Sequence, residues 1–323
     1  MSMDKAIYNF LRRGVMPTLQ GSIGAGPAFI DNNGKLSPWY NNKLWFVDKV
    51  NGSATNSGTS WDQALTTVTL AYAKCSTGDT IFVRGTGATA TTYLESIDII
   101  LRGIKIIGCS ESNNDVVWTG VAAAAITITG VTDCYIGNIR PRPASGYAGI
   151  SLIGAASYAT IEGCRFQGTT GSKYGIVSDG RQSGVKILGN DFRYMNTTSC
   201  YGIYAPIYGT TAEAASWDII GNNFHSNTYH LKGNLRYSLI EGNKFSSYGL
   251  NAAGAQAAPT KCLDLTPASG SVGNNQVTKN TFGGAYTTAL YVSASATEDW
   301  IGNYAAVTGT TAPYGLTVAI PAT

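Results

Sequence analysis

The chain has 323 residues, of which only 13% are charged, and its formal net charge is +3. An excess this small, with no basic cluster larger than Arg12-Arg13, does not indicate a nucleic-acid partner. The charged share is about half that of ordinary globular proteins. The polar surface must therefore come from Ser, Thr, Asn and 39 glycines, which suits closely spaced turns better than a helical enzyme.

Residues 1–42 are predicted to form a segment of their own. Apolar residues at helical spacing between positions 3 and 13 predict a short amphipathic helix. A helix of three turns is marginal alone, and a Gly/Pro/Asn-rich connector follows it over residues 14–42. We therefore expect this helix to dock on another protein, with folding back as a cap on the same chain as the alternative. Its apolar face comprises Met3, Ala6, Ile7, Phe10 and Leu11.

Residues 43–103 are expected to lead into a larger unit. Ser60 followed by Gln63 fits a capping box, which predicts a helix that begins there and ends at Gly78. The apolar segment Thr80–Arg84 is expected to be the first regular strand.

One short phrase recurs from residue 104 to residue 304: an apolar segment, then Gly, Asn, any residue and often Phe. Its copies stand at 161–166, 187–192, 219–224, 240–245 and 277–282, with weaker ones at 106–109, 135–138 and 300–303. The mean interval is about 28 residues, a period typical of solenoids and other repeat architectures. A second apolar phrase, such as Gly175-Ile176-Val177-Ser178, precedes most copies, so each unit holds at least two short strands.

Such strands are expected to pair with their counterparts one unit further along the chain, which predicts an all-β protein with a parallel β-helix over residues 104–323. Independent turns in an antiparallel sandwich are the alternative, but they give no reason for a shared Phe. Stacked coils place equivalent residues roughly 4.8 Å apart, where Asn side chains can hydrogen-bond to each other and to the turn backbone. The predicted ladder is Asn138, Asn190, Asn222, Asn243, Asn280 and Asn303, and the predicted aromatic stack is Phe166, Phe192, Phe224, Phe245 and Phe282.

The entry to this unit reads Trp45-Phe46-Val47-Asp48, Gly58-Thr59-Ser60-Trp61 and Gly78-Asp79-Thr80-Ile81-Phe82-Val83. With the repeats, it resembles the right-handed parallel β-helix superfamily of pectate-lyase-like proteins and bacteriophage tailspikes over residues 43–323. The resemblance implies a single-stranded right-handed β-helix of about eight coils, with a short capping helix that covers the N-terminal end of the coil stack. For function it implies a carbohydrate-facing or virion-facing surface, because this architecture hosts lyases, hydrolases and inert adhesins.

Candidate catalytic carboxylates are few. Glycoside hydrolysis needs two carboxyl groups about 5–9.5 Å apart. Glu162 and Glu241 share a repeat position but are expected three coils apart, roughly 14 Å at the strand spacing. Asp179 and Asp264 remain as candidates.

Each of these two aspartates also has a structural interpretation. Asp179 stands at a strand-to-turn junction that favours an Asx turn. Asp264 is expected on an outward-facing row between Lys232 and Tyr291, as one partner of a surface charge pair. On these grounds the sequence favours a non-enzymatic protein.

No pattern indicates a cofactor or a metal site, because the six cysteines lack CxxC or Cys/His spacing and no calcium loop is complete. The two histidines, His225 and His230, flank one short segment that we expect to be a solvated loop. Tyrosines are the residues best suited to binding, since their rings can stack on sugars or fill a subunit interface. They are Tyr174, Tyr201, Tyr204, Tyr208, Tyr229, Tyr237, Tyr248, Tyr286 and Tyr291.

The sequence thus predicts a non-enzymatic protein of the bacteriophage virion, assembled in the host cytoplasm. It would be a trimeric spike or fibre for host adsorption, or a capsid decoration protein that stabilises the particle. Residues 1–42 would contact other virion proteins, and a host surface glycan is the expected ligand; the homotrimer rests on analogy with phage β-helices. No membrane partner is expected, because no apolar run reaches about 18 residues and no signal-like region is present. The alternative is a polysaccharide-degrading tailspike enzyme, either a glycoside hydrolase or a lyase.

Overall fold

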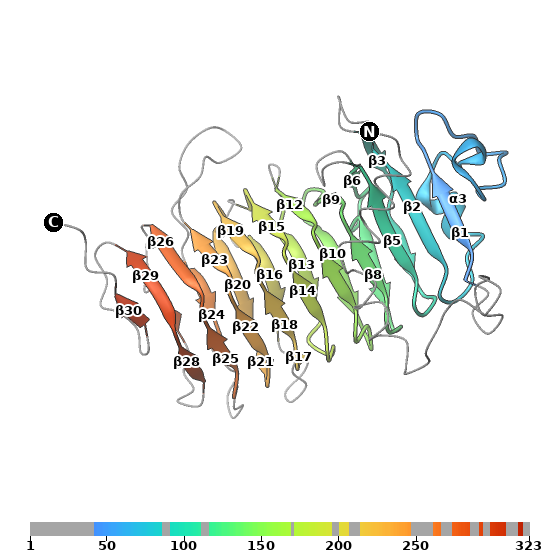
Figure 1. Ribbon diagram of the computed structural model, residues 1–323. Coiled ribbons are helices and arrows are strands. Elements are labelled where there is room, and N and C mark those ends of the chain that lie inside the picture. Colours follow the sequence, from blue (N-terminus) through green and yellow to red (C-terminus); the bar gives the residue numbers. More distant parts are fainter. Residues whose placement is uncertain are drawn as a thin grey trace, which may run out of the picture.

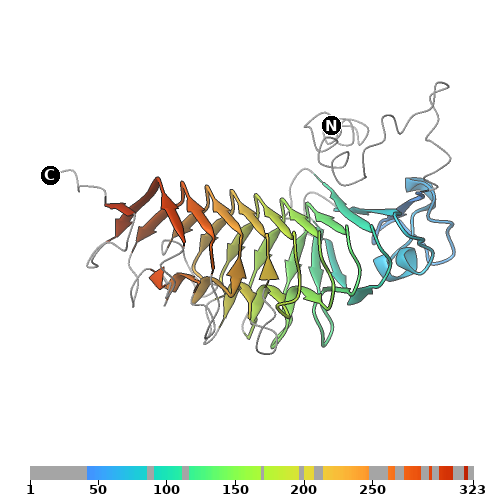
Figure 2. The same ribbon diagram turned by 90° about the horizontal axis from the view of Figure 1, so that it is seen from below.

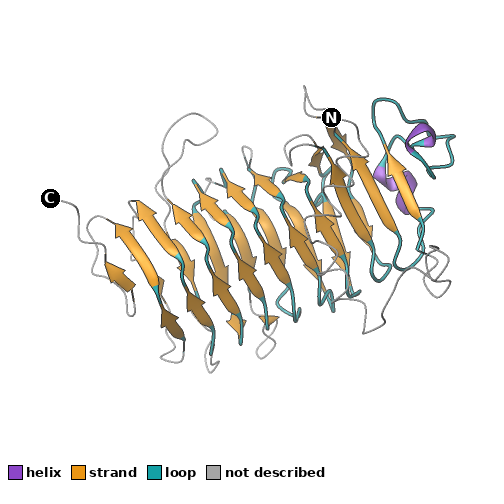
Figure 3. Cartoon of the chain, in the orientation of Figure 1, coloured by secondary structure: helices purple, strands orange, loops and turns teal. Residues whose placement is uncertain are grey.

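The structure is a computed structural model that describes residues 42–85, 91–110, 116–168, 171–195, 200–206, 214–246, 261–265, 273–284, 291–292, 298–307 and 316–318. These residues form an elongated stack of parallel strands, with the helical turns at its N-terminal end (Figures 1 and 3). The fold is a right-handed parallel β-helix, which confirms the prediction. The expected amphipathic helix at residues 3–13, including Met3, Ala6, Ile7, Phe10 and Leu11, lies outside the described residues.

The first and longest sheet holds ten strands, one above the next. The apolar-Gly phrases supply the eight strands from β5 to β28, and β1 and β2 of the entry segment extend the sheet by two. In stacking order the strands are β1 (Leu44–Val47), β2 (Thr80–Arg84), β5 (Lys105–Cys109), β8 (Tyr135–Gly137), β11 (Thr160–Glu162), β14 (Lys186–Leu188), β18 (Asp218–Ile220), β22 (Leu239–Glu241), β25 (Gln276–Thr278) and β28 (Asp299–Ile301).

Two further long sheets complete the coils, and Figure 2 shows their successive strands from below. The second sheet contains β4 (Ile97–Ile99), β7 (Ile126–Thr129), β10 (Ala148–Ile153), β13 (Tyr174–Ser178), β16 (Tyr201–Ala205), β20 (Tyr229–Gly233), β24 (Lys261–Asp264) and β27 (Tyr291–Val292). The third contains β12 (Arg165–Gln167), β15 (Asp191–Arg193), β19 (Asn223–His225), β23 (Lys244–Ser246), β26 (Thr281–Gly284), β29 (Asn303–Val307) and β30 (Leu316–Val318). Short strands form two smaller sheets: β3 (Thr91–Leu94), β6 (Val116–Thr119) and β9 (Arg140–Arg142), and β17 (Ala214–Ala215) with β21 (Leu235–Arg236).

The core consists of like residues stacked in columns, because every strand pairs in register with its counterpart one coil away. The first sheet contributes a column of fully buried aliphatic side chains, each worth roughly 1.5–3 kcal/mol when buried. This column is Ile81, Ile106, Ile136, Ile161, Ile187, Ile219, Ile240 and Val277. The third sheet contributes stacked rings with centroids 4.6 to 5.1 Å apart, in the order Phe166, Phe192, Phe224, Phe245 and Phe282.

A column of buried asparagines occupies the corner between the first and third sheets. Each side-chain nitrogen donates to a carbonyl oxygen of the first sheet at 2.6 to 2.9 Å, and all but that of the last, Asn303, also donate to the side-chain oxygen of the next asparagine at 3.0 Å. The oxygens of Asn222, Asn243, Asn280 and Asn303 also accept the backbone N–H of the asparagine before them, at 2.9 Å. The column contains Asn190, Asn222, Asn243, Asn280 and Asn303.

Asn138 does not belong to this column, so that part of the prediction was wrong. Gly137 is still part of β8 and pairs with Glu162. Asn138 therefore occupies the left-handed position that Gly163 takes one coil later, with a φ of 53°, and its side chain donates to the carbonyl oxygen of Gly108 at 2.6 Å. The column instead ends at Cys164, whose N–H donates to the side chain of Asn190.

The single helix expected after Ser60 is also wrong. A 3₁₀ turn, η1 (Trp61–Gln63), and a separate helix, α3 (Val68–Tyr72), stand in its place. Between them Leu65 is extended, and its N–H donates to the carbonyl oxygen of Phe46 in β1. Pairing with β1 thus replaces helical hydrogen bonds, and Thr67 rather than Ser60 caps α3. Among the described residues, no helix is long and apolar enough to cross a membrane.

Candidate functional site

Asp179, a predicted catalytic candidate, is held by several hydrogen-bond donors. Its carboxylate accepts the N–H of Gly154 in the preceding coil at 2.8 Å, the Arg181 guanidinium at 2.6 Å and the Gln182 amide at 2.5 Å. Burial alone would raise the pKa of Asp179, but these donors outweigh it and hold the pKa below its usual value. The oxygens therefore hold a turn between two coils and make a poor proton donor.

Asp264, the other candidate, lies on the outer row of the second sheet, only 3% exposed. The Nζ of Lys232 in the preceding coil lies 3.6 Å from its carboxylate, so the expected charge pair is present, but the expected surface position of Asp264 is wrong because its side chain is buried. The expected neighbour Tyr291 is wrong: Val292 pairs with Asp264, because β27 is offset by one residue from the expected register.

The two candidates cannot act on one glycosidic bond. Asp179 follows β13, and three successive strand pairings separate β13 from the β24 strand of Asp264. That is roughly 14 Å along the stack, beyond the carboxyl spacing of either hydrolytic mechanism.

The two histidines do not share a solvated loop, contrary to expectation. His225 ends β19, and its Nε2 lies 3.3 Å from the carboxylate of Asp191, one coil away. His230 is inside the core on β20, where its Nδ1 lies 3.2 Å from the Asn227 amide. Burial lowers the pKa of His230 to about 3, so it is neutral near pH 7. The sequence did not indicate the surroundings of either histidine, because Asp191 and the core residues belong to other coils.

Four of the predicted tyrosines come together on the outer face of the second sheet. Tyr174, Tyr201 and Tyr229 begin β13, β16 and β20, and they pair in register. The rings of Tyr201 and Tyr229 are stacked with centroids 4.7 Å apart. Tyr204 stacks on both Tyr201, at 4.7 Å, and Tyr174, at 5.4 Å. We call these four residues the tyrosine platform.

The tyrosine platform combines a fixed apolar surface with free polar groups. All four side chains are half-buried, and no hydrogen bond joins their hydroxyl groups to another described residue. Burial, reinforced by the neighbouring tyrosines, raises the pKa of Tyr201 to about 12, so its hydroxyl stays protonated and able to donate. Lys173, whose Nζ lies 5.4 Å from the Tyr174 ring, borders the platform.

The remaining predicted tyrosines are not part of the tyrosine platform. Tyr237 is exposed and lies against Arg236, which belongs to another sheet. Tyr208, Tyr248 and Tyr286 lie outside the described residues, as does the side chain of Tyr291.

The outer face of the third sheet carries a set of basic residues that the sequence did not single out. Neighbours in a strand alternate between faces, so the residues on either side of each buried Phe point outward, and strand pairing aligns them in two rows. The sequence does contain a signal for these rows, because they appear when the copies of the repeated phrase are aligned. Together with two arginines of the adjacent β9, they form what we call the basic strip: Arg140, Arg142, Arg165, Arg193 and Lys244.

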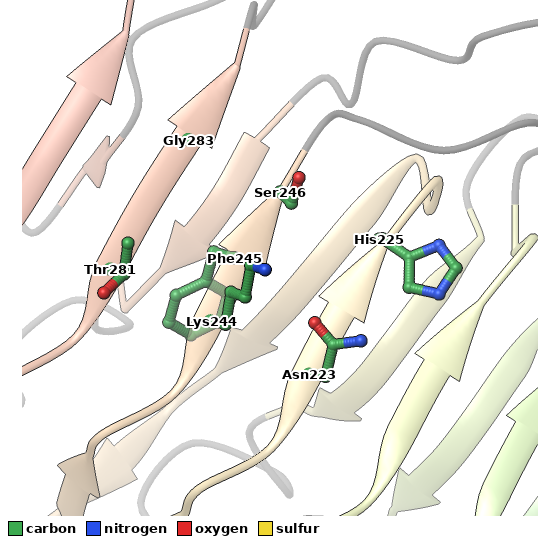
Figure 4. Close-up of a pocket in the computed structure, with 7 residues that line it drawn as sticks. All are labelled: Asn223, His225, Lys244, Phe245, Ser246, Thr281 and Gly283. Carbon is green, nitrogen blue, oxygen red and sulfur yellow. The ribbon is translucent and has the colours of Figure 1, made fainter.

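A pocket of about 350 Å³ opens next to the basic strip (Figure 4). Asn223 and His225 project into view from β19, and Lys244 and Ser246 belong to the neighbouring β23. Phe245, Thr281 and Gly283 complete the lining. The described part of the chain contains no group of three or more His, Cys, Asp or Glu side chains that could hold a metal ion.

Comparison with known proteins identifies the fold. No protein-family model and no curated protein matches the sequence. Among solved structures, pectate lyase Pel9A covers 86% of this chain and 74% of its own, with 15% identity and a TM-score of 0.55. A rhamnogalacturonan lyase covers 82% of this chain and 73% of its own, with 12% identity and a TM-score of 0.52.

A viral protein is also similar. ORF18 of Geobacillus virus E2 matches 82% of this chain at 12% identity and a TM-score of 0.50, and this chain spans 53% of its length. At such identities the likeness concerns the fold alone. The chain therefore has the pectate-lyase-like parallel β-helix fold that its sequence resembles.

Proposed function

We propose that this chain is a non-enzymatic surface protein of a bacteriophage particle that binds a host surface glycan through the tyrosine platform. One observation carries the proposal: four stacked tyrosines face outward on a rigid sheet with no protein partner for their hydroxyl groups among the described residues. Flat rings supply apolar area for the faces of sugar rings, while phenol hydroxyls bond sugar hydroxyls.

The platform is held in place before any ligand arrives. Its members are fixed by strand pairing and by contact with each other, so little side-chain entropy remains to be lost on binding. Preorganised tyrosines of this kind are frequent energetic centres of binding surfaces. A repeating sugar chain also suits a surface whose residues repeat at about 4.8 Å.

The non-enzymatic part of the proposal rests on the carboxylates. Asp179 is held by hydrogen-bond donors, Asp264 is paired with Lys232, and the two are about 14 Å apart along the stack. Glu162 and Glu241 are likewise separated by three strand pairings. The carboxyl pair that hydrolysis requires is thus missing from these candidates.

The virion part of the proposal takes the β-helix as a homotrimeric spike, fibre or capsid decoration protein, attached through residues 1–42. Support comes from the amphipathic pattern of the first residues. Antibody labelling of intact particles locates the protein, and deletion of residues 2–14 should abolish its assembly onto particles while the β-helix stays folded. A truncated chain that unfolds would instead identify the segment as a cap in cis.

The glycan part is tested on an array of defined neutral and acidic oligosaccharides. We expect Tyr201→Ala to weaken binding of the best ligand at least about tenfold, the scale of a tyrosine at a binding centre. The matched control is Tyr304→Ala, since Tyr304 is 45% exposed on the third sheet, away from the platform. Equal affinities for the two variants would refute the platform as the binding site.

A polysaccharide-degrading enzyme of the lyase class is the second candidate function. The observation that favours it is the His225–Asp191 pair, which lies among arginines on an outer face beside a pocket. Such a group contains a base and cations that can neutralise a sugar carboxylate. Depolymerisation of the bound polysaccharide, abolished by His225→Gln, Asp179→Asn or Asp264→Asn, would replace the non-enzymatic proposal with this one.

A further inference from the structure

The basic strip holds far more positive than negative charge. Its described residues include five cations, Arg140, Arg142, Arg165, Arg193 and Lys244, and one carboxylate, Asp191, so four positive charges remain uncompensated. Arg165, Arg193 and Lys244 lie on one face of the third sheet, whereas Arg140 and Arg142 lie on β9 of the neighbouring three-stranded sheet. The N–H of Arg165 donates to the carbonyl oxygen of Ile139, which fixes β9 beside β12 and brings the β9 arginines into the group.

Asp191 is shared among all the donors around it. Its two oxygens contact the guanidinium groups of Arg165 and Arg193, the Nε2 of His225 and the amide of Asn223. Burial would raise the pKa of Asp191, but the hydrogen bonds from His225 and Arg193 outweigh it and hold the pKa below its usual value. One carboxylate cannot satisfy this many cationic donors, so the strip has binding capacity to spare.

The arginines of the strip are partly buried, and their positive charges repel each other. Burial, followed by the charges of Arg142, Arg165 and Arg193, lowers the pKa of Arg140 to about 10. Among the described residues, several buried side-chain nitrogens have no hydrogen-bond partner: the donor Nε atoms of Arg140, Arg142 and Arg193, and the Nδ1 of His225. A buried donor without a partner is unfavourable, and a cluster of such donors marks a place where a ligand can supply the missing acceptors.

We propose that the basic strip and its adjoining pocket form an oxyanion-binding site that takes a carboxylate or phosphate group carried by a sugar chain. Charge complementarity selects an anion, and the planar guanidinium groups match two oxygens of either anion at once. The pocket gives the sugar ring a place beside the anion, against Asn223, Ser246 and Thr281. That the anion belongs to a glycan rests on the proposed function.

The strip and the tyrosine platform lie on either side of one corner. His225 ends β19, and after three residues Tyr229 begins β20 as a member of the platform. Tyr194 stands edge-on to the His225 ring, with centroids 5.7 Å apart, at the same corner one coil earlier. One sugar chain can therefore place its rings on the platform and its acidic groups on the strip.

The test uses three monosaccharide probes on the intact protein: glucuronate, glucose 1-phosphate and glucose. We expect saturable changes in the NMR signals of the Arg165, Arg193 and His225 side chains with at least one acidic probe, and none with glucose. Response to glucuronate alone or to the phosphate alone supports the site and identifies the anion. No response to either acid, or an equal response to glucose, would overturn the proposal.

Variants place the site. Arg193→Gln should weaken binding of the acidic probe about tenfold or more, since it removes a charge-assisted contact. Arg102→Gln is the matched control, because Arg102 pairs with Asp133 outside the strip and is well exposed. If Arg193→Gln does not fold, Arg165→Gln takes its place. Equal losses in the strip variant and the control would count against the site.

The two proposals fail separately. If acidic probes bind the strip but no oligosaccharide binds the platform, the proposed function is refuted and the oxyanion site is still supported. A neutral oligosaccharide bound at Tyr201 with no anion response at Arg193 would sink the oxyanion site alone.

Discussion

The asparagine column makes a prediction that the structure lets us work out in magnitude. Asn243 is 1% exposed and is bonded on both sides. Its oxygen accepts the backbone N–H of Asn222 at 2.9 Å, and its nitrogen donates to the carbonyl oxygen of Ile219 at 2.8 Å. Asn243→Ala removes this side chain and leaves the Asn222 N–H and the Ile219 carbonyl oxygen without these hydrogen bonds. Each buried group left unsatisfied costs about 1–3 kcal/mol, so we expect a loss of about 2–6 kcal/mol in the free energy of unfolding.

The matched control is the neighbouring asparagine of the preceding coil, Asn223, which faces outward. Its one side-chain hydrogen bond to another described residue is a long one, 3.4 Å to Asp191, so Asn223→Ala should cost less than about 0.5 kcal/mol. Urea unfolding followed by tryptophan fluorescence compares the two variants, and hydrogen exchange at the Asn222 amide reports the same site locally. Because stacked coils can open one by one, we expect faster exchange at Asn222 even where the global midpoint moves little. Equal stability and equal exchange in the two variants would refute the column as a stabilising element.

Three further predictions follow from single positions. Gly221 has a φ of 65° with open space around it, so Gly221→Ala should cost about 1–2 kcal/mol from backbone strain alone, whereas Gly221→Asn should cost less; thermal unfolding that ranks them equally would contradict this. The unfolded chain protonates His230 near its ordinary pKa of 6.5, whereas the folded pKa is about 3, so stability should fall as pH drops through this window. The slope should reach about 1.4 kcal/mol per pH unit, and urea unfolding of His230→Phe between pH 4 and 6 should lack it; an unchanged slope would contradict the neutral buried imidazole. Asp191→Asn leaves the basic strip without its carboxylate, so its unfolding midpoint should fall in dilute chloride buffer and recover in sulfate. A variant that sulfate does not rescue more than wild type would argue against repulsion in the strip.

Much of the fold was predictable because a solenoid repeats its physical requirements in every coil. The phrase around Ile187, Asn190 and Phe192 specifies a core residue, a corner hydrogen bond and a stacked ring within six residues. Copies of that phrase then fix the parallel register. Asn138 could not be placed from the phrase alone. Here the strand register is shifted by one residue, which puts Asn138 in the left-handed position although the Gly-Asn sequence is the same.

The entry helix was mispredicted for a similar reason. Ser60 and Gln63 match a capping box locally, but the backbone of Leu65 finds better partners in β1, which is distant from any helical pattern. Hydrogen bonds to β1 therefore outweighed the local helix signal. Thr66 and Thr67 have low helix propensity and would have stabilised the expected helix little.

The candidate sites were harder to predict, since each joins residues from several coils. Tyr201 and Tyr229 could be named from sequence but not brought together until the register was known. The contact between Asp191 and His225 crosses one whole coil, so a search for nearby acids in the sequence missed it. Outward rows become visible only when the repeats are aligned on their buried Phe.

The most direct test of the glycan-binding surface is hydroxyl-radical footprinting of the protein with and without its best-binding oligosaccharide, read by mass spectrometry. We expect the ligand to protect Tyr201, Tyr204 and Tyr229 together with His225, while the exposed Tyr237 and Tyr304 keep their reactivity. Protection confined to Tyr237 or Tyr304, with the four other side chains oxidised as before, would contradict the assignment of the binding surface.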